Sequence, residues 1–236
     1  MFDFTGKYVV VTGGNRGIGE AVVRRFLNEK AAGVAVLDVA EGLAYADPSE
    51  GGILYIGCDI TNRPAVASAF EQIYAKFGRV DVLVNNAGIT RDGMFHKMSD
   101  DNWDSVINVD LGGAYNCTRQ VINRMRGQAG GRIIFISSIS FYGNVGQANY
   151  ASAKGALVSL TKTLARESAR KNITVNCLLP AAIETGMLES LHYDKNDPNG
   201  PRMGKPENVA SLICYLCSDE ADFINGACID INGGAR

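Results

Sequence analysis

The sequence predicts an α/β fold in which one parallel sheet lies between two layers of helices. Short apolar runs alternate along the chain with stretches whose apolar residues recur at helical spacing. Uninterrupted apolar strands are typical of a parallel sheet that is covered on both faces. A length of 236 residues suits one domain, because a single core stops growing near ~250 residues. We therefore expect residues 1–236 to form a single domain.

The first half of the chain repeats a strand–loop–helix unit. The apolar run KYVVVT is followed by a Gly-rich turn and an amphipathic stretch. GVAVLD and GILYIG are further short apolar runs, and the next helix carries Val66, Phe70 and Ile73 on one face. The predicted strands of this half span residues 7–12, 33–38, 52–57 and 80–84, and the predicted helices span residues 17–30 and 63–77.

The second half continues the alternation. RIIFI and ITVNCLL are continuous apolar runs, as expected of buried strands, and longer amphipathic stretches separate them. The predicted strands span residues 132–136, 173–179 and 227–231, and the predicted helices span residues 101–126, 149–171 and 206–218. Residues 185–204 break the rhythm with Gly, Pro and polar residues, which predicts a substrate loop over a site.

Composition and charge exclude several classes of protein. The chain is 46% hydrophobic and 20% charged, which is typical of a globular protein and not of a disordered one. Its net charge of −2 gives no strong field for nucleic acid. It has neither ~18 consecutive apolar residues nor a signal-peptide pattern, so we expect no membrane association and a cytoplasmic location.

The six cysteines are expected to be reduced, because most lie in apolar runs and their density is below that of a disulfide scaffold. Cys214 and Cys217 form a CxxC pair. With only two His residues and no second Cys pair in the chain, a zinc site would lack ligands. We expect this pair to pack in a helix core and predict no metal.

The sequence TGGNRGIG at residues 12–19 links the first strand to the first helix. In this context Gly13 allows a tight turn, Gly17 lets a pyrophosphate approach the backbone, and Gly19 lets the helix pack against the strand. The helix N-terminus then faces an anion. The pattern predicts a dinucleotide site, although a plain Gly-rich turn is the alternative.

Asp38 ends the second predicted strand, where a carboxylate can accept hydrogen bonds from the adenosine ribose hydroxyls. It would repel a 2′-phosphate, which favours NAD(H). Arg16 in the glycine loop is a cation that could instead bind a 2′-phosphate. We favour NAD(H) over NADP(H) on Asp38, with the conflict left open.

NYASAK, at residues 149–154, places Tyr150 and Lys154 one helical turn apart. A free tyrosine has a pKa near ~10, and a nearby cation favours its phenolate form. The pair could therefore perform general acid–base catalysis. Taken alone, the spacing is better explained by a solvated Lys beside a Tyr of an amphipathic helix.

Five motifs in order remove that ambiguity: TGGNRGIG, NNAG, ISS, NYASAK and LLPAAIET. Together they resemble the short-chain dehydrogenase/reductase family over nearly the whole chain. NNAGITRDGMF, GQANYASAK and LARESARKNITVN are most similar to 3-oxoacyl-(acyl carrier protein) reductases and acetoacetyl-CoA reductases. The resemblance implies a doubly wound Rossmann-type domain with a seven-stranded parallel sheet.

The resemblance also implies residue roles. Tyr150 would exchange a proton with the substrate oxygen, Lys154 would lower the pKa of Tyr150 and hold the nicotinamide ribose, and Ser138 would hydrogen-bond the substrate. Asp59 would contact the adenine, and Thr185 the pyrophosphate region. The expected cofactor contacts are Gly13, Asn15, Arg16, Gly17, Ile18, Gly19, Asp38, Asp59, Ile60, Asn86, Ala87, Gly88, Tyr150, Lys154, Pro180, Ile183 and Thr185.

Asp110 is the main departure from the family pattern, since the family usually has an Asn there whose local kink holds a relay water. The Asp could preserve the kink, or it could add a charge near Lys154 and alter the relay. Asn108 is out of register as a substitute. We count Asp110 with the catalytic residues and expect slower but real turnover.

Two smaller departures concern the active-site serine and a loop glycine. Ser138 precedes Tyr150 by twelve residues, where many members have thirteen. We favour Ser138 as the functional hydroxyl, with Ser137 and Ser140 as alternatives. Ala181 replaces a Gly that commonly follows Pro180, which removes backbone freedom.

The predicted function is interconversion of a ketone and a secondary alcohol with NAD(P)(H), with a 3-oxoacyl thioester as the favoured substrate. An NAD-dependent dehydrogenase of a small diol, sugar or cyclic alcohol is the alternative among enzymes. A catalytically weak dinucleotide sensor is the alternative of another class. The resemblance further implies a homotetramer that assembles through the helices at residues 101–126 and 149–171 and through the C-terminal strand region.

Overall fold

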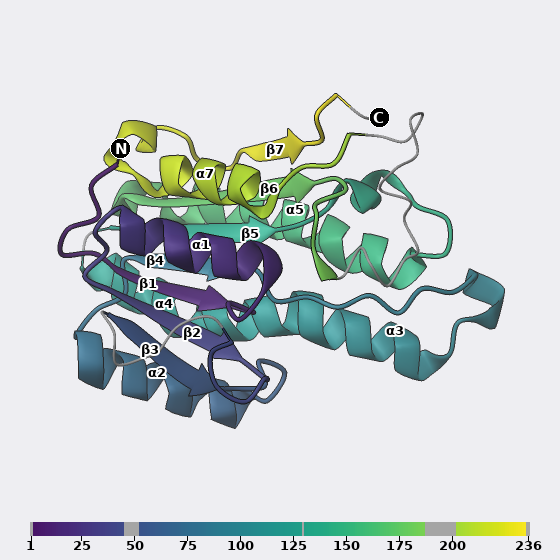
Figure 1. Ribbon diagram of the computed structural model, residues 1–236, viewed down its shortest axis with the longest axis horizontal. Coiled ribbons are helices and arrows are strands. Elements are labelled where there is room, and N and C mark those ends of the chain that lie inside the picture. The colour runs from purple at the N-terminus through teal and green to yellow at the C-terminus, as the bar shows by residue number, and fades with distance from the viewer. Residues whose placement is uncertain (1, 45–51, 129, 187–201, 235–236) are drawn as a thin grey trace.

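Seven strands form one parallel sheet in the order β3-β2-β1-β4-β5-β6-β7 (Figure 1). The computed structural model describes residues 2–44, 52–128, 130–186 and 202–234. The predicted α/β class and the Rossmann-type sheet are confirmed, and each strand boundary lies within two residues of its expected position. The strands are β1 (Tyr8–Thr12), β2 (Gly33–Asp38), β3 (Ile53–Gly57), β4 (Val82–Asn85), β5 (Gly131–Ile136), β6 (Ile173–Pro180) and β7 (Cys228–Ile231).

Helices cover both faces of the sheet. Helices α1 (Gly17–Asn28) and α7 (Pro206–Cys217) lie on one face, and α2 (Arg63–Phe77), α4 (Ala114–Gly127) and α5 (Ala148–Ser168) lie on the other (Figure 1). Each layer has its own apolar core: Phe26 and Ile213 are fully buried in one, and Phe70, Val121 and Leu157 are buried in the other. Burial of each such side chain contributes about 1.5–3 kcal/mol, which fixes the helices on the sheet.

The strand order reverses between β1 and β4. From β1 the chain adds β2 and β3 toward one edge, and from β4 it adds β5, β6 and β7 toward the other. The loops that follow β1 and β4 therefore diverge at the carboxyl edge of the sheet. Such a switch point leaves a crevice in which α/β proteins bind ligands.

The chain is helical throughout the predicted helix at residues 101–126, but the helix is not α-helical along its whole length. The chain instead forms α3 (Asp100–Val106), a π-helical segment (Ile107–Gly113) and then α4. The wide turn brings the side chain of Asp110 into the interior, where it is 1% exposed. A Cβ on Gly113 would lie 2.3 Å from Ile60 Cδ1, so the segment also packs too closely for a side chain there. Tertiary contacts, which periodicity does not encode, produce this widened turn.

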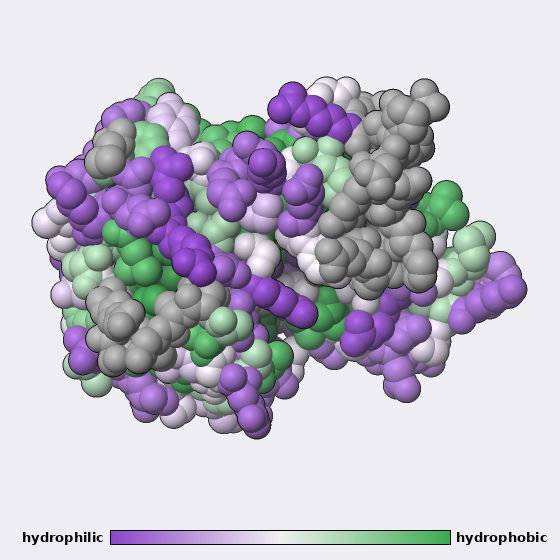
Figure 2. All heavy atoms as spheres, in the orientation of Figure 1, coloured by the Kyte–Doolittle hydropathy of each residue, from purple (hydrophilic) through white to green (hydrophobic). Residues whose placement is uncertain are grey.

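The cysteines behave as the sequence predicts. All six are free thiols; Cys214 and Cys217 are buried on α7 in the apolar core, and Cys228 is partly buried. Hydrophilic side chains cover much of the face shown in Figure 2. Within the described residues, no helix combines the length and apolar character that spanning a membrane requires.

Candidate active site

A cavity of about 520 Å³ lies at the carboxyl edge of the sheet. The loops that follow β1, β2, β3, β4, β5 and β6 all contribute to its wall, together with the start of α5. The cavity thus occupies the crevice that the strand order creates. Its lining includes Gly13, Arg16, Gly17, Ile18, Asp38, Asp59, Ile60, Asn86, Ala87, Gly88, Ser138, Tyr150, Lys154, Pro180, Ile183 and Thr185.

Three expected site residues do not line this cavity: Asn15, Gly19 and Asp110. The buried Asn15 side chain donates to the carbonyl of Gly42 and accepts from the amide of Ala44, so it holds the loop after β2. A Cβ on Gly19 would lie 2.0 Å from the carbonyl oxygen of Gly13, so Gly19 permits the contact of helix with strand. Asp110 acts behind the cavity wall, as described below.

The N-terminus of α1 forms one end of the cavity. Gly13 and Gly17 have φ angles of 63° and 55°, which a residue with a side chain adopts only with strain. Arg16 precedes the helix with an extended backbone, and no side chain caps the first turn. The lining residues Gly17 and Ile18 thus belong to a helix end that attracts an anion. This end of the cavity fits the pyrophosphate of a dinucleotide.

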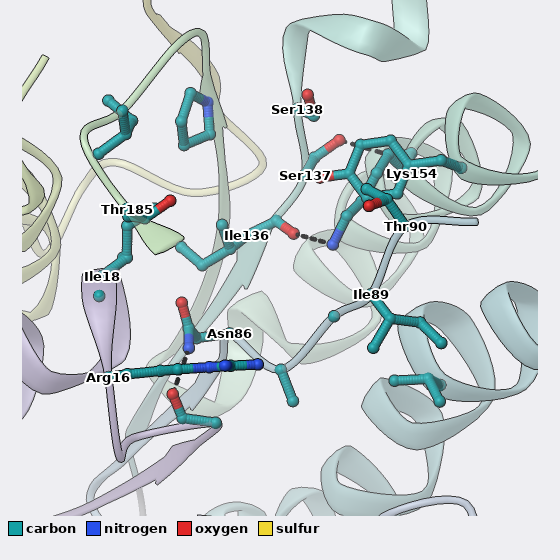
Figure 3. A pocket seen from close by; sticks show the side chains of 18 of the residues that line it. Arg16, Ile18, Asn86, Ile89, Thr90, Ile136, Ser137, Ser138, Lys154 and Thr185 are labelled. Carbon is teal, nitrogen blue, oxygen red and sulfur yellow. Dashed lines mark hydrogen bonds between the residues drawn. The ribbon is translucent and has the colours of Figure 1, made fainter. Parts of the chain in front are cut away.

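Asp38 and Arg16 both remain at the cavity. The two carboxylate oxygens of Asp38 accept hydrogen bonds from the amides of Asn15 and Ala40, each at 3.1 Å. Because a carboxylate oxygen can accept more than one bond, Asp38 retains capacity for a ribose hydroxyl. Arg16 is exposed and lies with Asn86 on the side of the cavity away from Ser138 and Lys154 (Figure 3).

A buried ion pair supports the other end of the cavity. Lys154 Nζ lies 3.0 Å from Asp110 Oδ2 and donates to the carbonyl of Ile136 at 2.9 Å (Figure 3). Asp110 Oδ1 accepts from the amide of Ile89 at 2.9 Å. Lys154 is 3% exposed, and its Nζ lies 5.3 Å from the ring centre of Tyr150. Three elements, the π-helical segment, β5 and α5, therefore surround the ammonium group.

Tyr150 is held in its phenol form. Burial raises the pKa of Tyr150, the charge of Lys154 lowers it, and the charge of Asp110 raises it again, with a net rise. Burial lowers the pKa of Lys154, but the charges of Asp110 and Tyr150 outweigh burial and keep the ammonium protonated. The expectation that Lys154 lowers the pKa of Tyr150 describes its own effect correctly. It omits burial, which has a larger effect than the charge of Lys154, and the charge of Asp110, which adds to the rise.

The three serines after β5 have different partners. Ser137 Oγ is buried and donates to the carbonyl of Lys154 at 2.8 Å. Ser138 Oγ accepts from the amide of Ser140 at 3.1 Å, donates to the hydroxyl of Ser140 at 3.2 Å, and lines the cavity together with Tyr150. Ser137 and Ser140 also line the cavity. The geometry supports the choice of Ser138, because the hydroxyl of Ser137 is already committed to α5.

Sequence reasoning missed two amide side chains in the cavity wall, Asn144 and Gln147. Gln147 Nε2 donates to Asp92 at 2.9 Å, and Gln147 Oε1 accepts from Asn144 at 2.8 Å. The available signal was the position of Gln147 three residues before Tyr150, on the same helical face. This chain of amides links the loop after β4 to the start of α5.

The predicted substrate loop at residues 185–204 falls mostly outside the described residues, which end at Gly186 and resume at Arg202. Its base is closed by a bridge between Ile183 and Gly204. Ala181, the departure from the usual glycine, donates its amide to the carbonyl of Ile231 and lines the cavity. The alanine is thus accommodated at the end of β6.

Comparison with known proteins gives the cavity its context. A family model described as short chain dehydrogenase matches residues 7–196. The chain belongs to the short-chain dehydrogenase family. Members use NAD(P)(H), and the chain is accordingly an NAD(P)-dependent oxidoreductase.

Relatives within this family align over almost the full length. The chain is 42% identical to acetoacetyl-CoA reductase of Shinella zoogloeoides, over 97% of this chain and 98% of that protein. It is 40% identical to 3-oxoacyl-(acyl-carrier-protein) reductase of Thermotoga maritima, over 97% of each chain. The corresponding reductase of Escherichia coli K12 is 37% identical over 98% of each chain.

Proposed function

We propose that this short-chain dehydrogenase reduces a 3-oxoacyl thioester to the 3-hydroxyacyl thioester. The observation that carries the proposal is the phenol of Tyr150, which lines one cavity with the Ser138 hydroxyl and lies beside the Lys154–Asp110 pair. The names of the relatives, a 3-oxoacyl-(acyl-carrier-protein) reductase and an acetoacetyl-CoA reductase, support this substrate class.

Ser138, Tyr150 and Lys154 have different roles in the reduction of the carbonyl group. The hydroxyls of Ser138 and Tyr150 hold the ketone oxygen, where negative charge develops during reduction. Tyr150 donates its proton to that oxygen, and the ammonium of Lys154 stabilises the resulting phenolate. The nicotinamide, when bound, supplies the hydride to the carbonyl carbon, so that one proton and one hydride convert the ketone to an alcohol.

The same geometry assigns residues to the dinucleotide. The backbone amides at Gly17 and Ile18 would hold the pyrophosphate, and Asp38 would accept hydrogen bonds from the adenosine ribose. Lys154, which lines the cavity, would hold the nicotinamide ribose through an N–H of its ammonium. Most of these contacts would suit NAD(H) and NADP(H) equally well. Only Asp38 and Arg16 would distinguish the two cofactors.

NAD(H) is the proposed cofactor. The Asp38 carboxylate lies at the end of β2 in the cavity wall and would repel a 2′-phosphate. Arg16 opposes this preference because it is a cation at the same end of the cavity. Comparison of kcat/KM for NADH and NADPH tests the proposal, and a lower value with NADH contradicts it.

The substrate proposal is tested by following the absorbance of reduced nicotinamide with acetoacetyl-CoA and each reduced cofactor. We expect consumption of the reduced cofactor in proportion to the thioester. Turnover of diols, sugars or cyclic alcohols with NAD, and none of acetoacetyl-CoA, would support the alternative dehydrogenase. Dinucleotide binding without any turnover would support a sensor, against which the presence of Ser138, Tyr150 and Lys154 in one cavity wall argues.

The proposed assembly is a homotetramer. A groove between the π-helical segment and α5 supports a subunit contact there, since Leu111, Tyr115 and Leu160 line it and Tyr115 is 45% exposed. Sedimentation is the direct test. A particle of one chain's mass, 25.2 kDa, at micromolar concentration contradicts the tetramer.

A further inference from the structure

Asp110 is a buried charge that the proposed reaction does not itself use. It lies outside the cavity wall, so it touches neither substrate nor cofactor. Its carboxylate is fixed at both oxygens, by Lys154 Nζ at 3.0 Å and by the amide of Ile89 at 2.9 Å. A Cβ on Gly88 would lie 2.8 Å from Asp110 Oδ2, so the glycine leaves room for the carboxylate. A charge held this firmly exerts a constant field on the site.

The field of Asp110 opposes that of Lys154. An isolated ammonium in a buried site would strongly favour the phenolate of Tyr150, because a low dielectric strengthens the attraction. The carboxylate lies 3.0 Å from this ammonium, and the pair as a whole carries no net charge. The ammonium remains near enough to support a phenolate in the reaction, but its pull on the resting Tyr150 is reduced.

The groups that act on Tyr150 and Lys154 come from several elements. Asp110 acts from the π-helical segment, Asp92 from the loop after β4, and Cys177 from β6, where it faces Lys154. Asp92 is exposed and its carboxylate accepts a hydrogen bond from Gln147, so water and that bond weaken its effect. Asp110, at 1% exposure, is the buried anion among these groups.

We propose that Asp110 is a positioning residue that offsets the pull of the Lys154 ammonium on Tyr150, so that Tyr150 keeps its proton to a higher alkaline pH than that ammonium alone would allow, and so favours proton donation and ketone reduction there. The proposal rests on the proposed function, since it names the direction in which that function runs. Removal of the Asp110 charge would move the site toward the phenolate, which is the form that accepts a proton from an alcohol.

The test measures the ionisation of Tyr150 without any turnover. The tyrosinate absorbance of Tyr150→Phe is subtracted from that of the parent protein over a pH titration, and the same subtraction is made with Asp110→Asn as parent. We expect the Tyr150 midpoint to fall by about one pH unit or more in Asp110→Asn, a tenfold change in the phenolate-to-phenol ratio. An unchanged or higher midpoint overturns the proposal. This holds also where the midpoint fails to fall because Lys154 loses its proton once the Asp110 charge is removed.

Asp81→Asn is the matched control. Asp81 is also a buried carboxylate, 6% exposed, but it accepts from the amide of Tyr8 and pairs with Arg79, both remote from the cavity lining. The substitution Asp81→Asn removes one carboxylate charge with the same change of shape as Asp110→Asn. We expect no shift of the Tyr150 midpoint in this variant, and a shift equal to that of Asp110→Asn counts against a local effect.

A second measurement serves if Asp110→Asn does not fold. In the wild-type protein the Tyr150 midpoint is expected above the ordinary value of 10.0, and a midpoint at or below that value overturns the proposal. Because neither titration needs substrate, failure of the proposed function leaves both interpretable. Where turnover is found, kcat for ketone reduction is expected to decline at lower pH in Asp110→Asn than in the wild type, with KM unchanged.

Discussion

Ser137 and Ser138 are adjacent hydroxyls for which the structure predicts opposite consequences of removal. Both serines line the cavity with Tyr150, and we assign the hydroxyl of Ser138 to the substrate, so Ser138→Ala removes a donor to the ketone oxygen. Loss of one such donor costs on the order of 10²–10³ in kcat. Ser137 is 2% exposed and bonds the carbonyl of Lys154, so Ser137→Ala removes a buried hydrogen bond of about 1 kcal/mol. That loss lowers Tm by about 2–4 °C.

The assay combines steady-state reduction of acetoacetyl-CoA with thermal unfolding of both variants. We expect Ser138→Ala to lose kcat and to keep the Tm of the wild type, and Ser137→Ala to lose stability while kcat falls by less than about tenfold. Equal activity of Ser138→Ala and the wild type would refute the assignment. Loss of kcat in Ser137→Ala alone would show that the first serine faces the substrate.

Three further substitutions probe other parts of the account. Gly88→Ala places a Cβ 2.8 Å from Asp110 Oδ2 and 3.1 Å from Lys154 Nζ, so we expect kcat/KM to fall by about tenfold or more, and wild-type kinetics would argue against the importance of this ion pair. Asp38→Ala removes the carboxylate that would repel a 2′-phosphate. The ratio of kcat/KM with NADPH to kcat/KM with NADH is therefore expected to rise by about tenfold or more. An unchanged ratio would exclude Asp38 as the residue that determines cofactor preference. Burial raises the pKa of Cys214 from 9.0 to about 12. Above pH 9.0 the thiol therefore loses its proton in the unfolded chain and retains it in the folded one. The free energy of unfolding then falls by about 1.4 kcal/mol per pH unit because of this thiol. Urea unfolding at increasing alkaline pH measures how the free energy of unfolding falls with pH. Cys214→Ala is expected to reduce that slope, and an identical slope in the variant would disprove the contribution of Cys214.

Local sequence patterns predict most of the fold. The seven strands coincide with apolar runs because a strand buried on both faces needs apolar side chains at every position. The glycine loop is equally local: Gly13 and Gly17 have positive φ angles, and Gly19 packs against the Gly13 carbonyl. Once the strands are parallel, their carboxyl edge collects the loops of the site. This is why the position of Asp38 and of the Tyr150 helix could be expected in advance.

Long-range contacts account for what the sequence did not reveal. The π-helical turn places Asp110 against Lys154, 44 positions away along the chain, and no periodicity records that contact. Burial raises the pKa of Tyr150 more than the charge of Lys154 lowers it, and this same carboxylate adds to the rise; both are properties of the packed structure. Gln147 was missed for a related reason, since its partner Asp92 approaches only when two distant loops meet.

The role of Tyr150 as proton donor is tested most directly by the reduction of acetoacetyl-CoA by Tyr150→Phe, with dinucleotide binding measured on the same sample. The variant keeps the ring and loses only the proton donor. We predict a loss of kcat on the order of 10²–10⁴, with dinucleotide affinity weakened by no more than the ~1 kcal/mol of one hydrogen bond. A variant that binds the dinucleotide and turns over at the wild-type rate contradicts the assignment of Tyr150 as the proton donor.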